Sequence, residues 1–137
     1  MDPAHLYWEG GFLLLSIHDI SIHTNMGENF YLLLGDFLDT FYAAAPECRR
    51  TMIATMPLDM DRQELVPFLA ATAHKLANDY DIVPPKWVFD PRCYLPGMKP
   101  HFACNARSNL RLLFMYKSPS EFKHRNLFVD ENVLVRV

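Results

Sequence analysis

Histidine and cysteine side chains could bind a metal ion in one part of this chain of 137 residues. His101 and Cys104 lie three positions apart, Cys93 precedes them, and His124 follows. Structural zinc sites normally use two close pairs of ligands, and only one close pair is present here. We therefore expect no metal and no cofactor, and keep a metal-assisted hydrolase that uses His101 and Cys104, with Cys93 as a further ligand, as the alternative.

Covalent catalysis would need a nucleophile with a base and an orienting group beside it. On a helix, Cys104 and His101 would face each other because of their three-residue spacing, but many unrelated pairs share that spacing. The sequence has no nucleophile elbow and no glycine-rich phosphate loop, and Gly10 and Gly11 are most simply a turn. The sequence therefore predicts a protein that is not an enzyme.

Basic residues are concentrated at the end of the chain, although its net charge is -3. Residues 1–98 contain 6 Lys and Arg against 13 Asp and Glu, whereas residues 99–137 contain 7 against 3. A guanidinium can bind a carboxylate or a phosphate through two parallel hydrogen bonds, so a basic face could contact an acidic protein or a phosphate group. The structural alternative is that the two halves of the chain attract each other within one fold. The basic residues of this candidate binding face are Arg107, Arg111, Lys117, Lys123 and Arg125.

Nucleic acid is not the expected partner of this face. The chain is acidic overall, and the helices expected in its first half lack the Arg, Lys, Asn and Gln residues of a recognition helix. A nucleic-acid-binding regulator that uses the basic C-terminal third is therefore a second alternative.

The cysteine count and the first residues favour a cytoplasmic location. Three cysteines cannot all pair with one another, so reduced thiols are expected. The first residues lack the basic start of a signal peptide, and the apolar run over residues 12–17 is far too short to span a membrane. We expect a cytoplasmic protein without a membrane segment.

The elements that must position these residues are predicted to be helices, which makes the fold class all-α. Apolar residues at intervals of three and four predict a helix over residues 28–44 and another over residues 62–79, with Asp61 as its cap. Pro46 begins a short helix over residues 47–55, and Pro67 is tolerated only near the start of the later helix. We expect a compact single-domain helical bundle over residues 1–137, with no convincing pair of strands.

Residues 84–105 form a segment rich in proline and aromatic residues, here called the strap. Its many large apolar side chains predict an ordered, irregular segment packed on the helices, because leaving each of them in water forfeits roughly 2 kcal/mol.

After the strap, a helix is expected over residues 107–117, with Leu110, Leu113 and Phe114 inward and Arg111 outward. Ser118 and Glu121 have the spacing of a capping box that starts a new short helix. Asn126 tolerates the left-handed conformation that ends helices, and Asp130 is expected to cap a last turn.

The C-terminal half also resembles a known family. The matching strings are Pro85-Lys86-Trp87-Val88 and the ending from Ser118-Pro119-Ser120-Glu121-Phe122 through Arg125-Asn126-Leu127-Phe128-Val129. They resemble small, uncharacterised bacterial helical proteins with a proline-tryptophan strap and an ending of the type Ser-Pro-x-Glu-Phe-basic-basic-Arg-Asn-Ile-Phe-Val. The family is similar to the antitoxin-like partners encoded beside nucleotidyltransferase-type toxins, and the resemblance covers residues 62–137.

The resemblance implies a protein-binding function. It implies that a partner-facing surface is formed or supported by Arg107, Arg111, Lys123, Arg125 and Asn126, together with Trp87. The alternative for Trp87, Phe122 and Phe128 is a place in the core. We therefore predict a non-enzymatic, antitoxin-like module that binds a protein partner of the nucleotidyltransferase-type toxin class, and we leave homo-oligomerisation open.

Overall fold

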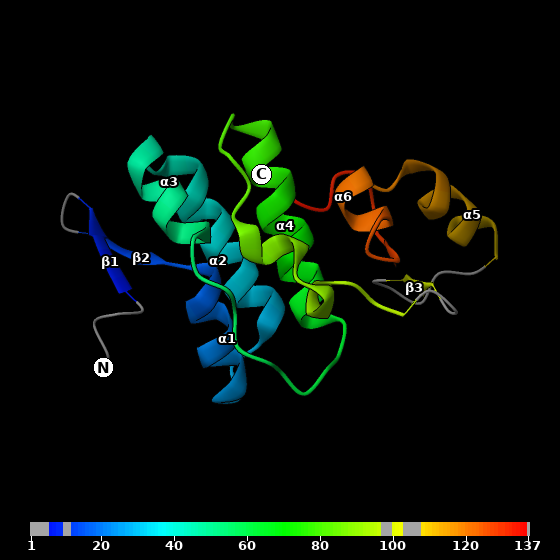
Figure 1. The fold of residues 1–137 in the computed structure, drawn as a ribbon, viewed down its shortest axis with the longest axis horizontal. Helices are drawn as coiled ribbons and strands as arrows, with labels where there is room; N and C mark the ends of the chain where they lie inside the picture. The colour runs from blue at the N-terminus through cyan, green and yellow to red at the C-terminus, as the bar shows by residue number, and fades with distance from the viewer. Residues whose placement is uncertain (1–5, 10–11, 97–99, 103–107, 137) are drawn as a thin grey trace. The chain divides into compact units, whose positions relative to one another are not determined.

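The computed structural model describes residues 6–9, 12–96, 100–102 and 108–136, and it is mostly helical (Figure 1). This confirms the all-α prediction. The chain divides into two compact units. Unit 1 comprises Met1–Asp61 with Arg136–Val137, and unit 2 comprises Arg62–Val135. None of the helices within the described ranges is long and apolar enough to cross a membrane. The expectation of one domain over residues 1–137 stays a prediction.

Unit 1 begins with a β-hairpin that the sequence analysis missed. Strand β1 (Leu6–Glu9) pairs antiparallel with β2 (Phe12–Leu15), and Leu6 lies opposite Leu15. The prediction of no paired strands was wrong here because β2 is four apolar residues in a row. Such a run lacks the alternation that marks a half-buried strand.

Helix α1 (Ile17–Asn25) was also not predicted, although its start carries a capping box. The Ser16 hydroxyl accepts a hydrogen bond from the Asp19 amide at 3.1 Å, and the Asp19 carboxylate accepts one from the Ser16 amide at 3.0 Å. The box satisfies two amides that have no partner inside the helix. Its residues lie just after the strand that the analysis missed.

Helix α2 (Phe30–Ala43) confirms the helix expected over residues 28–44. It begins at Asn29, whose side-chain oxygen accepts a hydrogen bond from the Leu32 amide at 3.1 Å. Its apolar stripe is buried as the three-and-four spacing predicts: Phe30, Leu33, Leu34, Phe37, Leu38 and Phe41.

Helix α3 (Pro46–Ile53) confirms the expected short helix, with Pro46 in the first turn. Arg49 links it to the end of α2 because its guanidinium donates to the carbonyl oxygens of Phe41 and Tyr42 at 2.9 and 2.8 Å. These bonds satisfy carbonyl groups at the C-terminal end of α2.

Unit 2 is built on α4 (Leu65–Asp79), which begins three residues later than predicted. The residue before the helix is Glu64, not Asp61, so the predicted cap was wrong. The later start places Pro67 third in the helix. There its missing amide proton costs nothing, because first-turn amides have no acceptor within the helix.

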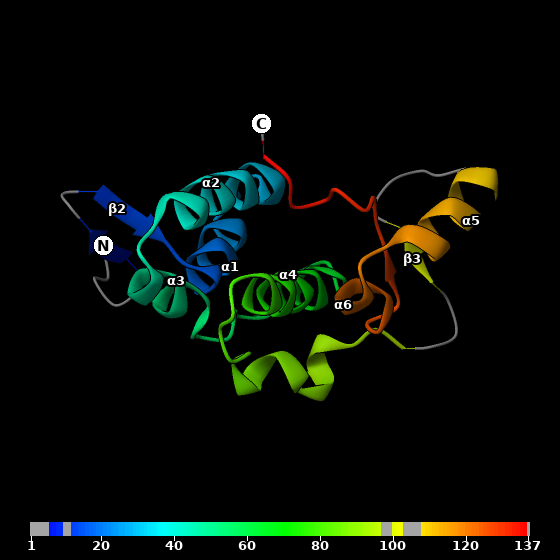
Figure 2. The ribbon, with the colours of Figure 1, turned by 90° about the horizontal axis from the view of Figure 1, so that it is seen from above.

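The strap contains two short 3-10 helices, η2 (Lys86–Phe89) and η3 (Pro91–Cys93), which both contact α4 (Figure 2). Val88 and Cys93 are fully buried. The prediction of an ordered, irregular segment packed on a helix is confirmed for the described part of the strap.

The end of unit 2 contains α5 (Ser108–Lys117), α6 (Ser120–Lys123) and a short parallel pair, β3 (His101–Phe102) with β4 (Leu127–Phe128). Between α6 and β4, Asn126 has φ 63°, which confirms the expected left-handed residue.

The capping box predicted for Ser118 and Glu121 was wrong. The Ser118 hydroxyl instead accepts from the Val129 amide at 2.8 Å and lies against the carbonyl oxygens of Phe114 and Val129. Ser118 thus links the end of α5 to the residue after β4, because the hydroxyl is buried where those backbone groups need a partner. The expected contact at Asp130 is present, since its carboxylate accepts from the Asn132 amide at 2.8 Å.

Candidate protein-binding surface

Helix α5 exposes four large apolar side chains, which we call the α5 arc: Leu112, Leu113, Met115 and Tyr116. Leu112 is 65% and Tyr116 79% exposed, whereas Phe114 is buried. Helical geometry places the four residues on a sector about 160° wide, centred opposite Phe114. The expectation that Leu113 points inward was wrong: it is 47% exposed, because the helix contacts its unit through the opposite side.

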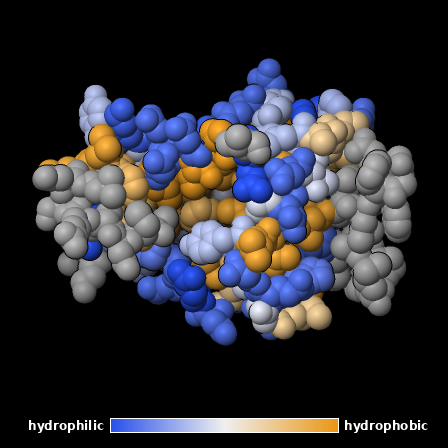
Figure 3. Space-filling view, turned by 180° about the vertical axis from the view of Figure 1, so that it is seen from behind, coloured by the Kyte–Doolittle hydropathy of each residue, from blue (hydrophilic) through white to orange (hydrophobic). Residues whose placement is uncertain are grey.

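Among the residues whose burial the structure describes, no other helix exposes as many large apolar side chains as α5. Hydrophobic residues also reach the surface among hydrophilic ones on the face drawn in Figure 3. In the described part of unit 2, the other exposed large apolar residues belong to separate segments: Tyr80, Val83, Phe89 and Val135. Scattered apolar residues are normal on a protein surface, whereas a contiguous group marks an interaction site.

Three of the predicted basic residues lie at the margins of the α5 arc. Arg111 is exposed, as expected, and its guanidinium carbon lies 5.2 Å from the centre of the Phe102 ring. Lys117 forms an ion pair with Glu131 at 3.7 Å, and both side chains are about half exposed, at 47% and 52%.

The third cation, Lys123, comes from α6. Its ammonium group donates to the Tyr116 carbonyl oxygen at 2.5 Å and lies 5.9 Å from the centre of the Tyr116 ring. A cation near the last carbonyls of a helix is favoured by the helix dipole. Lys123 therefore stabilises the end of α5 and holds positive charge beside the most exposed residue of the α5 arc.

Arg125 does not belong to this surface, and its assignment as a partner-facing residue was wrong. It is 1% exposed. Its guanidinium donates to the carbonyl oxygens of Glu121 at 2.8 Å and Val88 at 2.7 Å, and lies 4.8 Å from the centre of the Tyr94 ring. The side chain is removed from solvent where it meets these backbone acceptors of the strap and of α6.

The buried guanidinium also contacts a histidine of α4. Arg125 donates to His74 Nδ1 at 3.2 Å. A guanidinium can only donate, so this bond requires a neutral imidazole whose proton is on Nε2. Burial, followed by the nearby Arg125 charge, lowers the pKa of His74, which favours that neutral form. Arg125 therefore connects α4, α6 and the strap.

Glu121 lies at the edge of the same cluster. Its carboxylate accepts from the Asn78 side chain at 2.8 Å. Burial raises the pKa of Glu121, but the bond from Asn78 and the charge of Lys75 outweigh burial, so the pKa lies below its ordinary value. The ionised form of the carboxylate is thus favoured.

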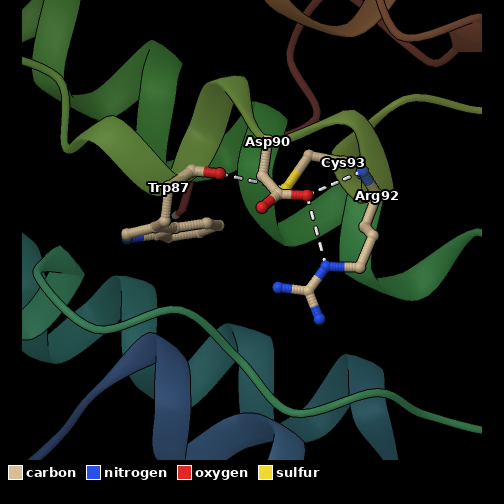
Figure 4. A network of polar contacts seen from close by, with 4 residues as sticks. All are labelled: Trp87, Asp90, Arg92 and Cys93. Carbon is tan, nitrogen blue, oxygen red and sulfur yellow. Dashed lines mark hydrogen bonds and ion pairs between the residues drawn. The ribbon is translucent and has the colours of Figure 1, made fainter.

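Asn126 and Trp87 have structural contacts in the strap. The side-chain Nδ2 of Asn126 donates to the Pro96 carbonyl oxygen at 2.9 Å. Figure 4 shows Trp87 with its neighbours: its carbonyl oxygen accepts from the Asp90 amide at 3.0 Å and from the Cys93 thiol at 3.3 Å. The Asp90 carboxylate in turn accepts from the amide and the guanidinium of Arg92. Neither Asn126 nor Trp87 lies on α5, and their assignment to a partner-facing surface stays a prediction.

The alternative metal site is not assembled by the residues in view. Burial raises the pKa of the Cys93 thiol to about 11, so the thiolate that zinc requires is disfavoured. No three His, Cys, Asp or Glu residues in the described ranges lie close enough to hold a metal ion. Cys104 and Arg107 lie outside the described residues, so a pairing of His101 with Cys104 stays a hypothesis.

Comparisons of the chain with protein-family models, curated proteins and solved structures found no match. What the structure itself shows is a mostly helical protein in which α5 exposes four apolar side chains beside several cations.

The α5 arc itself was missed by the sequence analysis, which assigned the binding surface to basic residues together with Asn126 and Trp87. The signal was present, since residues 112–116 read Leu-Leu-Phe-Met-Tyr. Five successive apolar residues cannot all face the interior from one side of a helix. Of this run, the sequence analysis expected Leu113 and Phe114 to point inward, because nothing in the sequence shows which side of α5 is covered.

Proposed function

We propose that this protein is a non-enzymatic module that binds another protein through the α5 arc. The observation that carries the proposal is the exposure of Leu112, Leu113, Met115 and Tyr116 on a single helix. Removing such a side chain from water contributes roughly 1.5–3 kcal/mol when burial is complete. A partner that covers the arc would therefore gain binding energy from a compact area, as hot-spot residues provide in protein interfaces.

We propose further that the partner is a toxin-like enzyme of the nucleotidyltransferase type, which the module neutralises in the cytoplasm. The partner class is supported by the resemblance of residues 62–137 to antitoxin-like proteins. The mode of binding is supported by the position of Arg111, Lys117 and Lys123 at the margins of the arc. The cytoplasmic location is supported by the three cysteines and by the buried Cys93 thiol.

The experiment is isolation of the native complex. The full chain is expressed in its host with a removable affinity tag, recovered at mild salt, and the eluted proteins are identified by mass spectrometry. We expect one stoichiometric enzyme, which co-elutes with the purified chain in size-exclusion chromatography and loses activity when the chain is added.

A matched pair of variants links that result to the surface. Leu112→Glu changes an exposed residue of the arc, and Leu58→Glu changes an exposed leucine of unit 1. We expect only Leu112→Glu to abolish recovery and inhibition of the enzyme. Recovery of the chain as a monomer without a partner, or equal loss with both variants, would contradict the proposed function.

A further inference from the structure

We infer that the α5 arc takes an amphipathic helix of the partner, with Asp and Glu residues along both sides of that helix's apolar stripe. The inference rests on the proposed function and adds the chemistry of the segment that binds. It depends on the arrangement of apolar and basic side chains around α5.

The shape of the arc suits a helix. Its four residues lie within positions 112–116, so the arc extends along about one turn of α5 and matches about one turn of a second helix packed along it. By helical geometry, Leu112 lies near the middle of the arc, with Met115 and Tyr116 one turn further along. A partner helix would contact such a surface through apolar residues spaced three and four positions apart.

Cations border the arc on both sides. At about 100° per residue, Arg111 falls next to Met115 on one side, and Lys117 falls next to Leu113 on the other. The stacking of Arg111 on Phe102 and the pairing of Lys117 with Glu131 hold both groups near these margins. Carboxylates on both sides of the partner's stripe would meet these cations, which steers association and fixes orientation.

Three other occupants fit the charges less well. A second copy of the chain packed α5 against α5 would bring like charges together, which is unfavourable. Phosphates of a nucleic acid would contact the cations and leave the apolar residues in water. An anionic membrane is recognised by larger clusters of Lys and Arg residues, whereas among the described residues only Arg111, Lys117 and Lys123 border the arc.

The probes are two synthetic helical peptides with the same leucine stripe, one flanked by glutamate and one by lysine. Binding to the full chain is measured by isothermal titration calorimetry at low and high salt. We expect the glutamate peptide to bind, to weaken at high salt, and to bind about tenfold more tightly than the lysine peptide. Equal affinity for both peptides, or no binding of the glutamate peptide, would overturn the inference.

Charge reversals locate the site. The variant with Arg111→Glu and Lys117→Glu is compared with one that carries Arg50→Glu and Lys86→Glu, which makes the same change in net charge at exposed residues that belong to other elements. Circular dichroism and urea unfolding confirm that both variants fold. We expect only the first to lose at least about tenfold affinity for the glutamate peptide, and an equal effect of both variants would overturn the inference.

Two further measurements decide between occupants. Co-sedimentation with phosphatidylglycerol vesicles tests a membrane, and light scattering during size-exclusion chromatography tests self-association. Vesicle binding or dimerisation that Leu112→Glu abolishes, at concentrations where the glutamate peptide does not bind, would overturn the inference.

If the native enzyme is recovered but the peptides are not distinguished, the inference fails while the proposed function stands. If the peptides are distinguished but no enzyme is recovered, the proposed function fails instead.

Discussion

Replacement of Arg125 by methionine tests whether this buried cation holds unit 2 together. The substitution keeps an unbranched side chain but removes the donors to the carbonyl oxygens of Val88 and Glu121, which lie at 2.7 and 2.8 Å. A hydrogen bond from a charged donor contributes about 1.5–3 kcal/mol. Because removing a buried charge also removes its desolvation cost, we expect Arg125→Met to lower the free energy of unfolding by about 3 kcal/mol.

Urea unfolding followed by tryptophan fluorescence measures this effect. The chain has two tryptophans, so a Trp8→Phe background leaves Trp87 in the strap as the reporter of unit 2. Arg92→Met is the matched control, because Arg92 is an exposed arginine of the same strap that pairs with Asp90. A shift for Arg125→Met no larger than that for Arg92→Met would refute the assignment of Arg125 as the residue that connects α4, α6 and the strap.

Three further predictions concern stability. The lowered pKa of His74 means that the folded state binds fewer protons than the unfolded state just below about pH 6.5, so unit 2 loses stability as pH falls through that window. Urea midpoints at neutral and mildly acidic pH should differ less in His74→Phe, and an unchanged difference would contradict the buried neutral imidazole. Gly35→Ala should stabilise α2 by about 1 kcal/mol in an Arg136→Ala background and by less in the native chain, because the new Cβ would lie 3.0 Å from the Arg136 guanidinium. Equal gains in thermal unfolding would exclude that contact. Asn126→Val should be less stable than Asn126→Gly by about 1–2 kcal/mol in urea, since φ is 63°, and equal midpoints would contradict this backbone conformation.

The elements that the sequence predicted correctly depend on short-range patterns. The stripe of α2 repeats over four turns, so its spacing alone identifies the buried side. Asn126 was identified because asparagine tolerates a positive φ, which is a property of one residue and its neighbours. Proline marked the start of α3 for a similarly local reason, since its fixed φ suits a first turn.

The elements that the sequence did not predict depend on partners far away in the chain. In the sequence, Arg125 is one of several cations expected at the surface. In the structure it is a buried donor, because the Val88 carbonyl oxygen, 37 residues earlier in the chain, lies beside it. Ser118 has the spacing of a capping box, but its hydroxyl instead accepts a hydrogen bond from the Val129 amide, 11 residues later. The α5 arc was missed for the same reason, because the side of the apolar run 112–116 that stays exposed is decided by what packs against Phe114.

Hydrogen exchange of α5 in the free chain and in the native complex tests the central claim most directly. The full chain is compared with its stoichiometric complex by mass spectrometry of peptic peptides. We predict that residues 111–117 gain more protection on binding than any other segment, because the partner covers the α5 arc. Protection confined to other segments, such as α2 or the strap, with α5 unchanged, would contradict the claim that α5 is the surface through which this protein binds its partner.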